Sequence, residues 1–232
     1  MLDQIGTIVL VAAMIVNIGA LAAAIPGGWP QRFLLLAIGG LWSGLAVMLA
    51  GSGALLSAAL GPVPPVGVLV VIPLLAAALA AASWPAFRAT LLALPTELLI
   101  GLNTIRVLGF FFLLLAAAGR LAGPFPYSAG WGDVITGGLA LPVIAYMARQ
   151  PGERIVPQIW NCFGTLDLLA AVTLGATSAQ GTPLEVFHTG IPGPLPVQSL
   201  PWSLIPTVLV PFYLILHGIL FAQLRRRPAL AT

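Results

Sequence analysis

Long apolar stretches, separated by short polar or proline-rich connections, set the pattern of this chain. Seven of these stretches have about the 20 residues that a helix needs to cross a hydrocarbon core roughly 30 Å thick. We therefore predict an all-α fold, a polytopic transmembrane bundle of seven helices that forms a single domain over residues 1–232. The predicted spans are 5–25, 31–51, 66–84, 93–119, 131–149, 157–178 and 203–224.

The charge content favours a membrane protein over a soluble one. Only 6% of the 232 residues are charged and 59% are hydrophobic, whereas soluble domains carry about 25% charged residues. Apart from Arg106 and a run of three at 225–227, the basic residues stand singly at the predicted helix ends. Basic residues in this arrangement anchor a protein at the membrane surface, so no nucleic-acid partner is expected.

The arginines alternate between the connections, and this alternation predicts the orientation. The odd-numbered connections and the C-terminus carry seven arginines, whereas the even-numbered connections carry one, Arg120. Because basic residues mark the cytoplasmic side, we expect an N-terminus outside, a C-terminus in the cytoplasm and a multi-pass protein of the cell inner membrane. The seven arginines on the expected cytoplasmic side are Arg32, Arg88, Arg149, Arg154, Arg225, Arg226 and Arg227.

Several residue types are scarce, which removes whole classes of chemistry. The chain has no lysine, so it cannot form the Schiff base of a retinal protein or of a pyridoxal-phosphate enzyme. It has one cysteine, Cys162, and two histidines, His188 and His217. One cysteine makes no internal disulfide, and two histidines are too few for a histidine-based zinc or haem site. No metal and no cofactor are predicted.

Ionisable residues at membrane depth are costly and are therefore the first candidates for function. Arg106 lies about 20 Å from the cytoplasmic end of the fourth predicted span, and Asp167 about 15 Å from that of the sixth, at ~1.5 Å per residue. We expect the two to pair near the midplane, because an unpaired arginine there would cost several kcal/mol. The pair either holds the bundle together or also contacts a substrate.

A second polar layer is predicted nearer the cytoplasm. Glu97 and His217 lie about 6 Å and 10 Å from that side, Asn161 shares the layer, and Asn103 follows Glu97 on the same span. A carboxylate, an imidazole and amides at one depth favour a proton relay or a polar pocket. Alternatively, Glu97 extends to the interface. Glu97 and Arg106 are about 180° apart around their helix, so at least one of them serves packing.

Three other features have structural interpretations. Asp133 stands at the predicted start of the fifth span, where a helix cap is favoured over contact with a substrate. Trp42 lies in mid-span beside the Gly40–Gly44 pair, so we expect it to pack against a neighbouring helix. The segment 179–202 is rich in proline, and it either folds over the outer mouth as a cap or forms a loose exterior loop.

Several short segments carry a family resemblance. The stretch from Asn103-Thr104-Ile105-Arg106 through Gly130-Trp131-Gly132-Asp133, followed by Trp160-Asn161 and Asp167, is similar to an uncharacterised family of bacterial seven-helix inner-membrane proteins. The resemblance implies the topology of seven membrane-spanning helices and carries no assigned activity.

These observations favour a membrane protein that binds or transports a small molecule through a polar site between the fourth, sixth and seventh helices. One alternative is a non-catalytic sensor or a subunit of a membrane complex. Another is a membrane-embedded enzyme that acts on a lipid or isoprenoid, although an enzyme is the less favoured class. The expected partners are the lipid bilayer and a small-molecule or lipid ligand. The candidate ligand-binding or proton-relay residues are Glu97, Asn103, Arg106, Asn161, Asp167 and His217.

Overall fold

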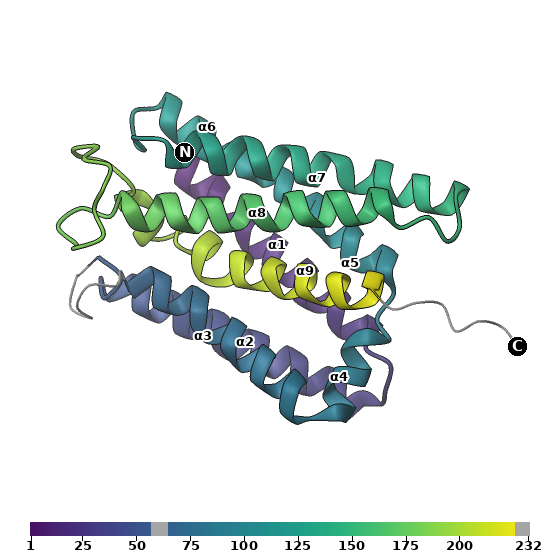
Figure 1. The fold of residues 1–232 in the computed structure, drawn as a ribbon. Coiled ribbons are helices and arrows are strands. Elements are labelled where there is room, and N and C mark those ends of the chain that lie inside the picture. Colours follow the sequence, from purple (N-terminus) through teal and green to yellow (C-terminus); the bar gives the residue numbers. More distant parts are fainter. Residues whose placement is uncertain (57–64, 226–232) are drawn as a thin grey trace, which may run out of the picture.

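The computed structural model describes residues 1–56 and 65–225, and the regular elements in these ranges are all helical (Figure 1). Seven spans in the described ranges are long and apolar enough to cross a membrane, which agrees with the predicted number. Arg226 and Arg227, part of the charge argument, lie outside the described residues. The elements are α1 (Leu2–Ala24), α2 (Trp29–Gly51), α3 (Pro65–Ser83), α4 (Pro85–Leu92), α5 (Thr96–Leu102), η1 (Asn103–Gly109), α6 (Phe110–Ala117), α7 (Phe125–Arg149), α8 (Ile155–Thr177), η2 (Leu195–Gln198), η3 (Ile205–Leu209) and α9 (Val210–Arg225).

The long helices run roughly along one direction, with α9 in the interior and α2 and α3 at the periphery (Figure 1). Helix α7 packs against α5, η1, α6 and α8, and α9 packs against α3 and α8. The N-terminus lies at one end of the bundle and α9 finishes at the other (Figure 1). An odd number of crossings produces this separation of the two ends.

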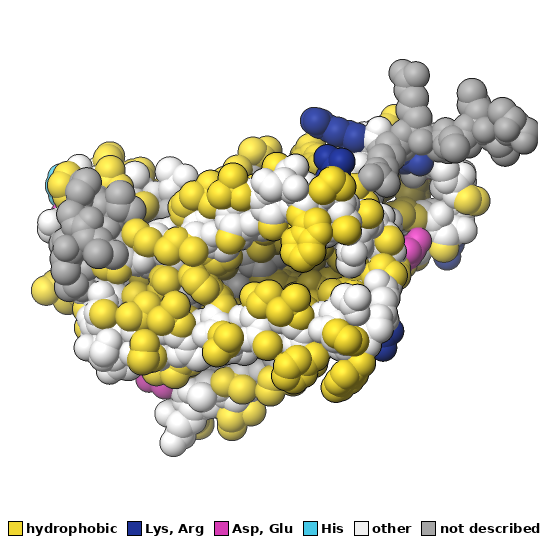
Figure 2. Space-filling view, turned by 90° about the horizontal axis from the view of Figure 1, so that it is seen from below, with side chains coloured by type: hydrophobic (Ala, Val, Ile, Leu, Met, Phe, Trp, Pro, Cys, Tyr) yellow, Lys and Arg dark blue, Asp and Glu magenta, His cyan; other side chains and the backbone are white. Residues whose placement is uncertain are grey.

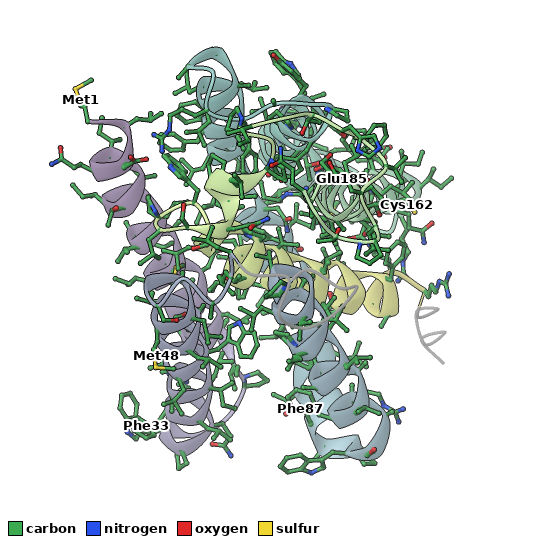
Figure 3. The ribbon with its side chains drawn as sticks, turned by 90° about the vertical axis from the view of Figure 1, so that its left-hand side faces the viewer. Met1, Phe33, Met48, Phe87, Cys162 and Glu185 are labelled. Atoms are coloured by element: carbon green, nitrogen blue, oxygen red, sulfur yellow. The ribbon has the colours of Figure 1, made fainter. Side chains whose placement is uncertain are left out.

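The outward-facing side chains are apolar. In Figure 3, Phe33 and Met48 on α2 and Cys162 on α8 point away from the bundle, and all three are exposed. Figure 2 shows the same property across one whole face, where charged side chains are confined to the ends. A surface of this kind suits lipid rather than water.

The fourth predicted span, 93–119, is not one continuous α-helix. It consists of α5, the 3₁₀ segment η1 and α6, and the short helix α4 precedes it. Within η1, Asn103 Nδ2 donates to the Leu99 carbonyl at 2.9 Å and Thr104 Oγ1 to the Gly101 carbonyl at 2.7 Å. Side chains that bond to preceding carbonyls compete with the regular helical ladder, and a 3₁₀ stretch inside a helix often marks a functional segment.

The fifth span begins at Phe125, six residues before the predicted start at 131. The prediction treated the preceding prolines and glycines as a loop. Pro124 and Pro126 instead occupy the start of α7, where the missing proline N–H has no intrahelical partner to lose. The predicted capping role of Asp133 is therefore wrong, because Asp133 lies two turns inside the helix.

A π-helical segment, η3, precedes α9 and contains Pro206. Pro211 follows and has no N–H to donate to the Thr207 carbonyl, its usual α-helical partner. That carbonyl accepts a hydrogen bond from Trp42 Nε1 at 2.8 Å. The expected packing of Trp42 against a neighbouring helix is thus confirmed, and the proline explains why an acceptor is available there.

Segment 179–202 packs against the end of the bundle where α1 begins. Val197 and Trp202 are buried, and the Trp202 ring lies 5.3 Å from that of Phe111. Trp202 Nε1 donates to Asp3 at 2.7 Å, and Arg120 forms an ion pair with the same Asp3 oxygen at 2.8 Å. These contacts support the cap interpretation of the segment over a loose loop.

Candidate functional site

Arg106 of η1 is the centre of a buried polar cluster. It is 2% exposed, and its Nε donates to Asp133 Oδ1 at 2.7 Å while its Nη2 donates to Asp167 Oδ2 at 2.5 Å. Its Nη1 lies 3.2 Å from the Gly164 carbonyl and 2.9 Å from His217 Nε2. The expected pairing of Arg106 with Asp167 is confirmed, and Asp133 is a second acidic partner, to which the sequence analysis assigned a different role.

The geometry around His217 defines its protonation. A guanidinium group has only donors, so His217 Nε2 must accept from Arg106 and carries no hydrogen. On the other side of the ring, Nδ1 lies 2.7 Å from Asn161 Oδ1 and therefore donates to it. The Asn161 amide is itself oriented by donating from Nδ2 to the His217 carbonyl at 3.2 Å. His217 is consequently a neutral imidazole with both nitrogens engaged.

Small residues make room for this cluster. A Cβ atom on any of three glycines would collide with a cluster side chain, so the charged groups can approach the backbones of neighbouring helices only because these positions have no side chain. The glycines and the side chains that they accommodate are Gly109 with Asp133, Gly132 with Asp167, and Gly164 with His217.

Two side chains extend the cluster toward α1. The Tyr213 ring lies 5.8 Å from the Arg106 guanidinium carbon, within cation–π distance. The Tyr213 hydroxyl accepts a hydrogen bond from Asn17 Nδ2 at 2.9 Å, and Asn17 is itself 1% exposed. The sequence offered a signal for Asn17, because it is the only strongly polar interior residue of the first span.

The six predicted site residues divide into two groups. Arg106, Asn161, Asp167 and His217 come together in the cluster. Asn103 is buried on η1, but its Nδ2 donates back to the Leu99 carbonyl, and its Oδ1 has no hydrogen-bond partner among the described residues. Glu97 is exposed at the start of α5. Since Glu97 is exposed and His217 is wholly buried, the structure does not bring them together as a relay would require.

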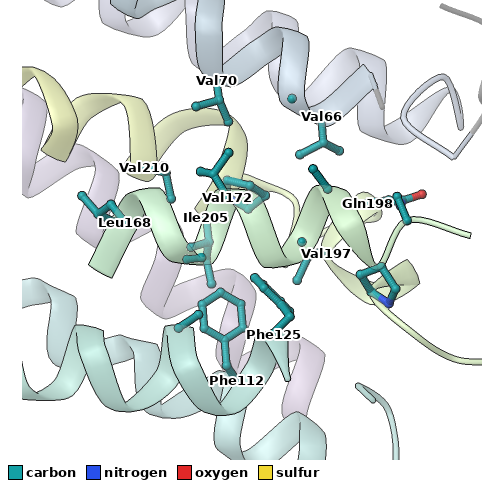
Figure 4. A pocket seen from close by; sticks show the side chains of 18 of the residues that line it. Val66, Val70, Phe112, Phe125, Leu168, Val172, Val197, Gln198, Ile205 and Val210 are labelled. Carbon is teal, nitrogen blue, oxygen red and sulfur yellow. The ribbon is translucent and has the colours of Figure 1, made fainter. Parts of the chain in front are cut away.

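A partly open cavity, which we call the α3–α8 pocket, adjoins the cluster (Figure 4). It runs from the 194–198 segment to Asp133 and Leu168, and along α8 its lining extends from Ala176 to Leu168, about 12 Å at 1.5 Å per residue. Among the described lining residues, Asp133 is the only charged one and Gln198 the only other polar one. The lining residues are Val66, Gly67, Val70, Phe112, Phe125, Ala129, Asp133, Leu168, Ala171, Val172, Gly175, Ala176, Ala179, Pro194, Val197, Gln198, Ile205, Pro206 and Val210.

A second, much smaller cavity of about 20 Å³ lies beside Arg106, Asp133 and Tyr213. That volume is enough for one water molecule, which needs about 10–15 Å³ and two to four polar partners. The linings of the two cavities have four residues in common, Asp133, Leu168, Ile205 and Val210. Asp133 is therefore the point at which the charged cluster reaches both cavities.

The site offers little to a metal ion. Within residues 1–56 and 65–225, no group of three or more His, Cys, Asp and Glu side chains could hold one. In the cluster the carboxylates already receive guanidinium hydrogen bonds, and the imidazole faces a donor on one side and an amide on the other. The arrangement suits hydrogen bonding and proton exchange.

The fold and the site together indicate a class: a helical bundle whose seven apolar helices suggest a multi-pass membrane protein, with one buried ion cluster. The chain belongs to the family described as a domain of unknown function (DUF8737), whose family model matches residues 63–225. The matched range contains every charged member of the cluster and leaves α1 and α2 outside it. No curated protein and no solved structure matches the chain.

Proposed function

We propose that this protein is an integral membrane protein that binds a slender, largely apolar small molecule in the α3–α8 pocket. The observation that carries the proposal is the lining of that pocket, which is apolar along its length and ends at one carboxyl group, Asp133. Ligand sites commonly combine apolar walls with a few placed polar groups. The site therefore lies beside the polar cluster rather than within it, since the larger pocket touches none of the six residues named from the sequence.

The shape of the pocket restricts the ligand. Its cavity volume is about 70 Å³, less than half of the roughly 150 Å³ cavity that holds a benzene ring, so the enclosed space takes only part of a long ligand. A narrow pocket whose lining extends about 12 Å along α8 favours one segment of a single acyl or isoprenoid chain over a sugar or a fused ring system, with the rest of the chain in the opening of the pocket. A small head group with a hydrogen-bonding oxygen would meet Asp133 at the inner end.

Photolabelling tests the proposal with a defined probe, a long-chain fatty alcohol that carries a diazirine. In purified protein, label should concentrate on peptides from α3, α8 and segment 194–198. Ala171→Phe should reduce that labelling several-fold, because Ala171 is buried in the pocket wall. Ala78→Phe is the matched control, since Ala78 is exposed on α3 and is not part of the lining. Even labelling over all apolar faces, unchanged in Ala171→Phe, would exclude the pocket as the site.

The proposed orientation has the N-terminus outside and the C-terminus in the cytoplasm of a bacterial inner membrane. The arginine distribution supports it, and Figure 2 shows arginine side chains gathered at the end where α9 finishes. The single arginine of the opposite end, Arg120, pairs with Asp3. A reporter that is active only in the cytoplasm should work when fused after Thr232. If that fusion is inactive and a periplasmic reporter at the same site is active, the orientation is reversed.

A further inference from the structure

The charges in the buried cluster do not balance. Arg106 supplies one positive charge, and Asp133 and Asp167 supply two carboxyl groups. His217 contributes no charge, because its Nε2 accepts from Arg106 and its Nδ1 donates to Asn161. With both carboxyls ionised, the cluster would hold one uncompensated negative charge in the interior of the bundle.

An uncompensated charge at this depth is strongly disfavoured. Removing an ion from water without full compensation costs several kcal/mol, and buried groups usually become neutral instead. The carboxyl side chains of Asp133 and Asp167 are only 12% and 5% exposed, so solvent screens them little. A positive charge must come from outside the cluster.

Within the part of the chain that the structure describes, no other side chain near the cluster supplies that charge. Helix α9 brings Tyr213 and His217, of which Tyr213 accepts from Asn17 and His217 is neutral. Helix α1 brings Asn17, which does not ionise. Helices α3 and α6, which pack on the same region, contain no ionisable residue. The balancing charge is therefore a proton or a small cation.

The geometry favours a proton over a metal cation. Hard cations require about six oxygen ligands, whereas the oxygens here are few and face a guanidinium group. One oxygen of each aspartate accepts from Arg106, which leaves the second oxygen of each to carry a hydrogen. The cavity of about 20 Å³ beside Asp133 has room for one water molecule through which that proton can exchange.

We propose that Asp133 and Asp167 together bind one exchangeable proton. Asp133 lines both the water-sized cavity and the α3–α8 pocket, so the proton is accessible from each of them. The proton makes the cluster neutral and leaves Arg106 with one ionised and one protonated partner. A neutral cluster at the end of the pocket also suits a neutral head group. The inference rests on the cluster geometry alone, so it stands or falls separately from the ligand proposal.

Infrared spectroscopy of the purified full-length chain at neutral pH tests the proposal. The wild-type protein should show one buried carboxylic acid carbonyl band per chain that shifts in D₂O. Asp133→Asn and Asp167→Asn should each abolish that band, because the remaining carboxylate then pairs one-to-one with Arg106. Both variants should fold, since asparagine resembles a protonated aspartate. Arg106→Gln should double the carboxylic acid carbonyl absorbance per chain, because neither carboxyl group then has a cation to pair with.

A matched control separates this proton from others. Besides the two cluster aspartates and Asp3 in the first turn of α1, Glu97 is the remaining acidic residue on an apolar span. Its side chain is exposed. Glu97→Gln should leave the cluster band unchanged. A wild-type spectrum without a carboxylic acid band would overturn the proposal and point to a bound cation or a charged His217. A band that survives in both single asparagine variants would also overturn it, because the proton would then belong to another group.

Discussion

Replacing Arg106 with leucine should destabilise the protein more than any other single change in the cluster. The substitution removes hydrogen bonds to two carboxyl groups, one carbonyl and one imidazole, and it leaves both acids without a cation. Breaking a buried ion pair by removing one partner costs about 3–5 kcal/mol. For a chain of this length, 1 kcal/mol corresponds to about 2–4 °C in midpoint temperature, so we expect a decrease of roughly 6–20 °C.

Thermal unfolding of the detergent-purified protein measures this effect, and Arg120→Leu is the control. Arg120 also forms an ion pair, but its side chain is 38% exposed, and exposed pairs contribute about 0–1 kcal/mol. The double variant Arg106→Leu/Asp167→Leu should lose less stability than the sum of the two single variants. If Arg106→Leu costs no more than Arg120→Leu, or if the losses are purely additive, the buried cluster does not exist as described.

Three further predictions concern neighbouring features. Gly132→Ala should lower stability by about 1–3 kcal/mol in thermal unfolding because its Cβ collides with Asp167, whereas Gly138→Ala, with open space around it, should be neutral or stabilising. Trp42→Phe removes the hydrogen bond to a backbone carbonyl of η3 and should cost about 0.5–1.5 kcal/mol; an unchanged midpoint would contradict this. The first backbone N–H of α8 donates to the Glu153 carboxylate and holds the pKa of that carboxyl below its usual value. The stabilisation of the folded state by this bond should therefore be complete at a pH above the pKa of Glu153 in the unfolded chain, and it should be lost as the pH falls through the pKa of Glu153 in the folded protein. NMR titration of the labelled carboxyl, compared with an unfolded peptide, checks the direction.

The helical spans were predictable because hydropathy depends on local composition, and bilayer thickness sets their length. The interruption at 103–109 was not, since side chains such as Asn103 and Thr104 bond backwards to carbonyls only in the context of the folded bundle. The start of α7 was predicted six residues too late, because prolines at the start of a helix resemble loop residues in a sequence.

The error in the predicted start of α7 had the largest consequence for the predicted site. Asp133 was assigned to a cap, whereas the structure places it opposite Arg106. The pairing of Arg106 with Asp167 was predictable from depth and from the cost of an unpaired charge. The relay between Glu97 and His217 was not supported, because equal depth says nothing about direction around a helix. The angle of about 180° between Glu97 and Arg106 already separated the two faces, and His217 lies with Arg106.

A crystal structure of the full-length protein grown in a lipid phase tests the central claim most directly. It should show Arg106 between Asp133 and Asp167, with elongated density in the α3–α8 pocket that ends near Asp133. An Arg106 side chain turned away from both aspartates, or a pocket filled by its own side chains, would contradict the account.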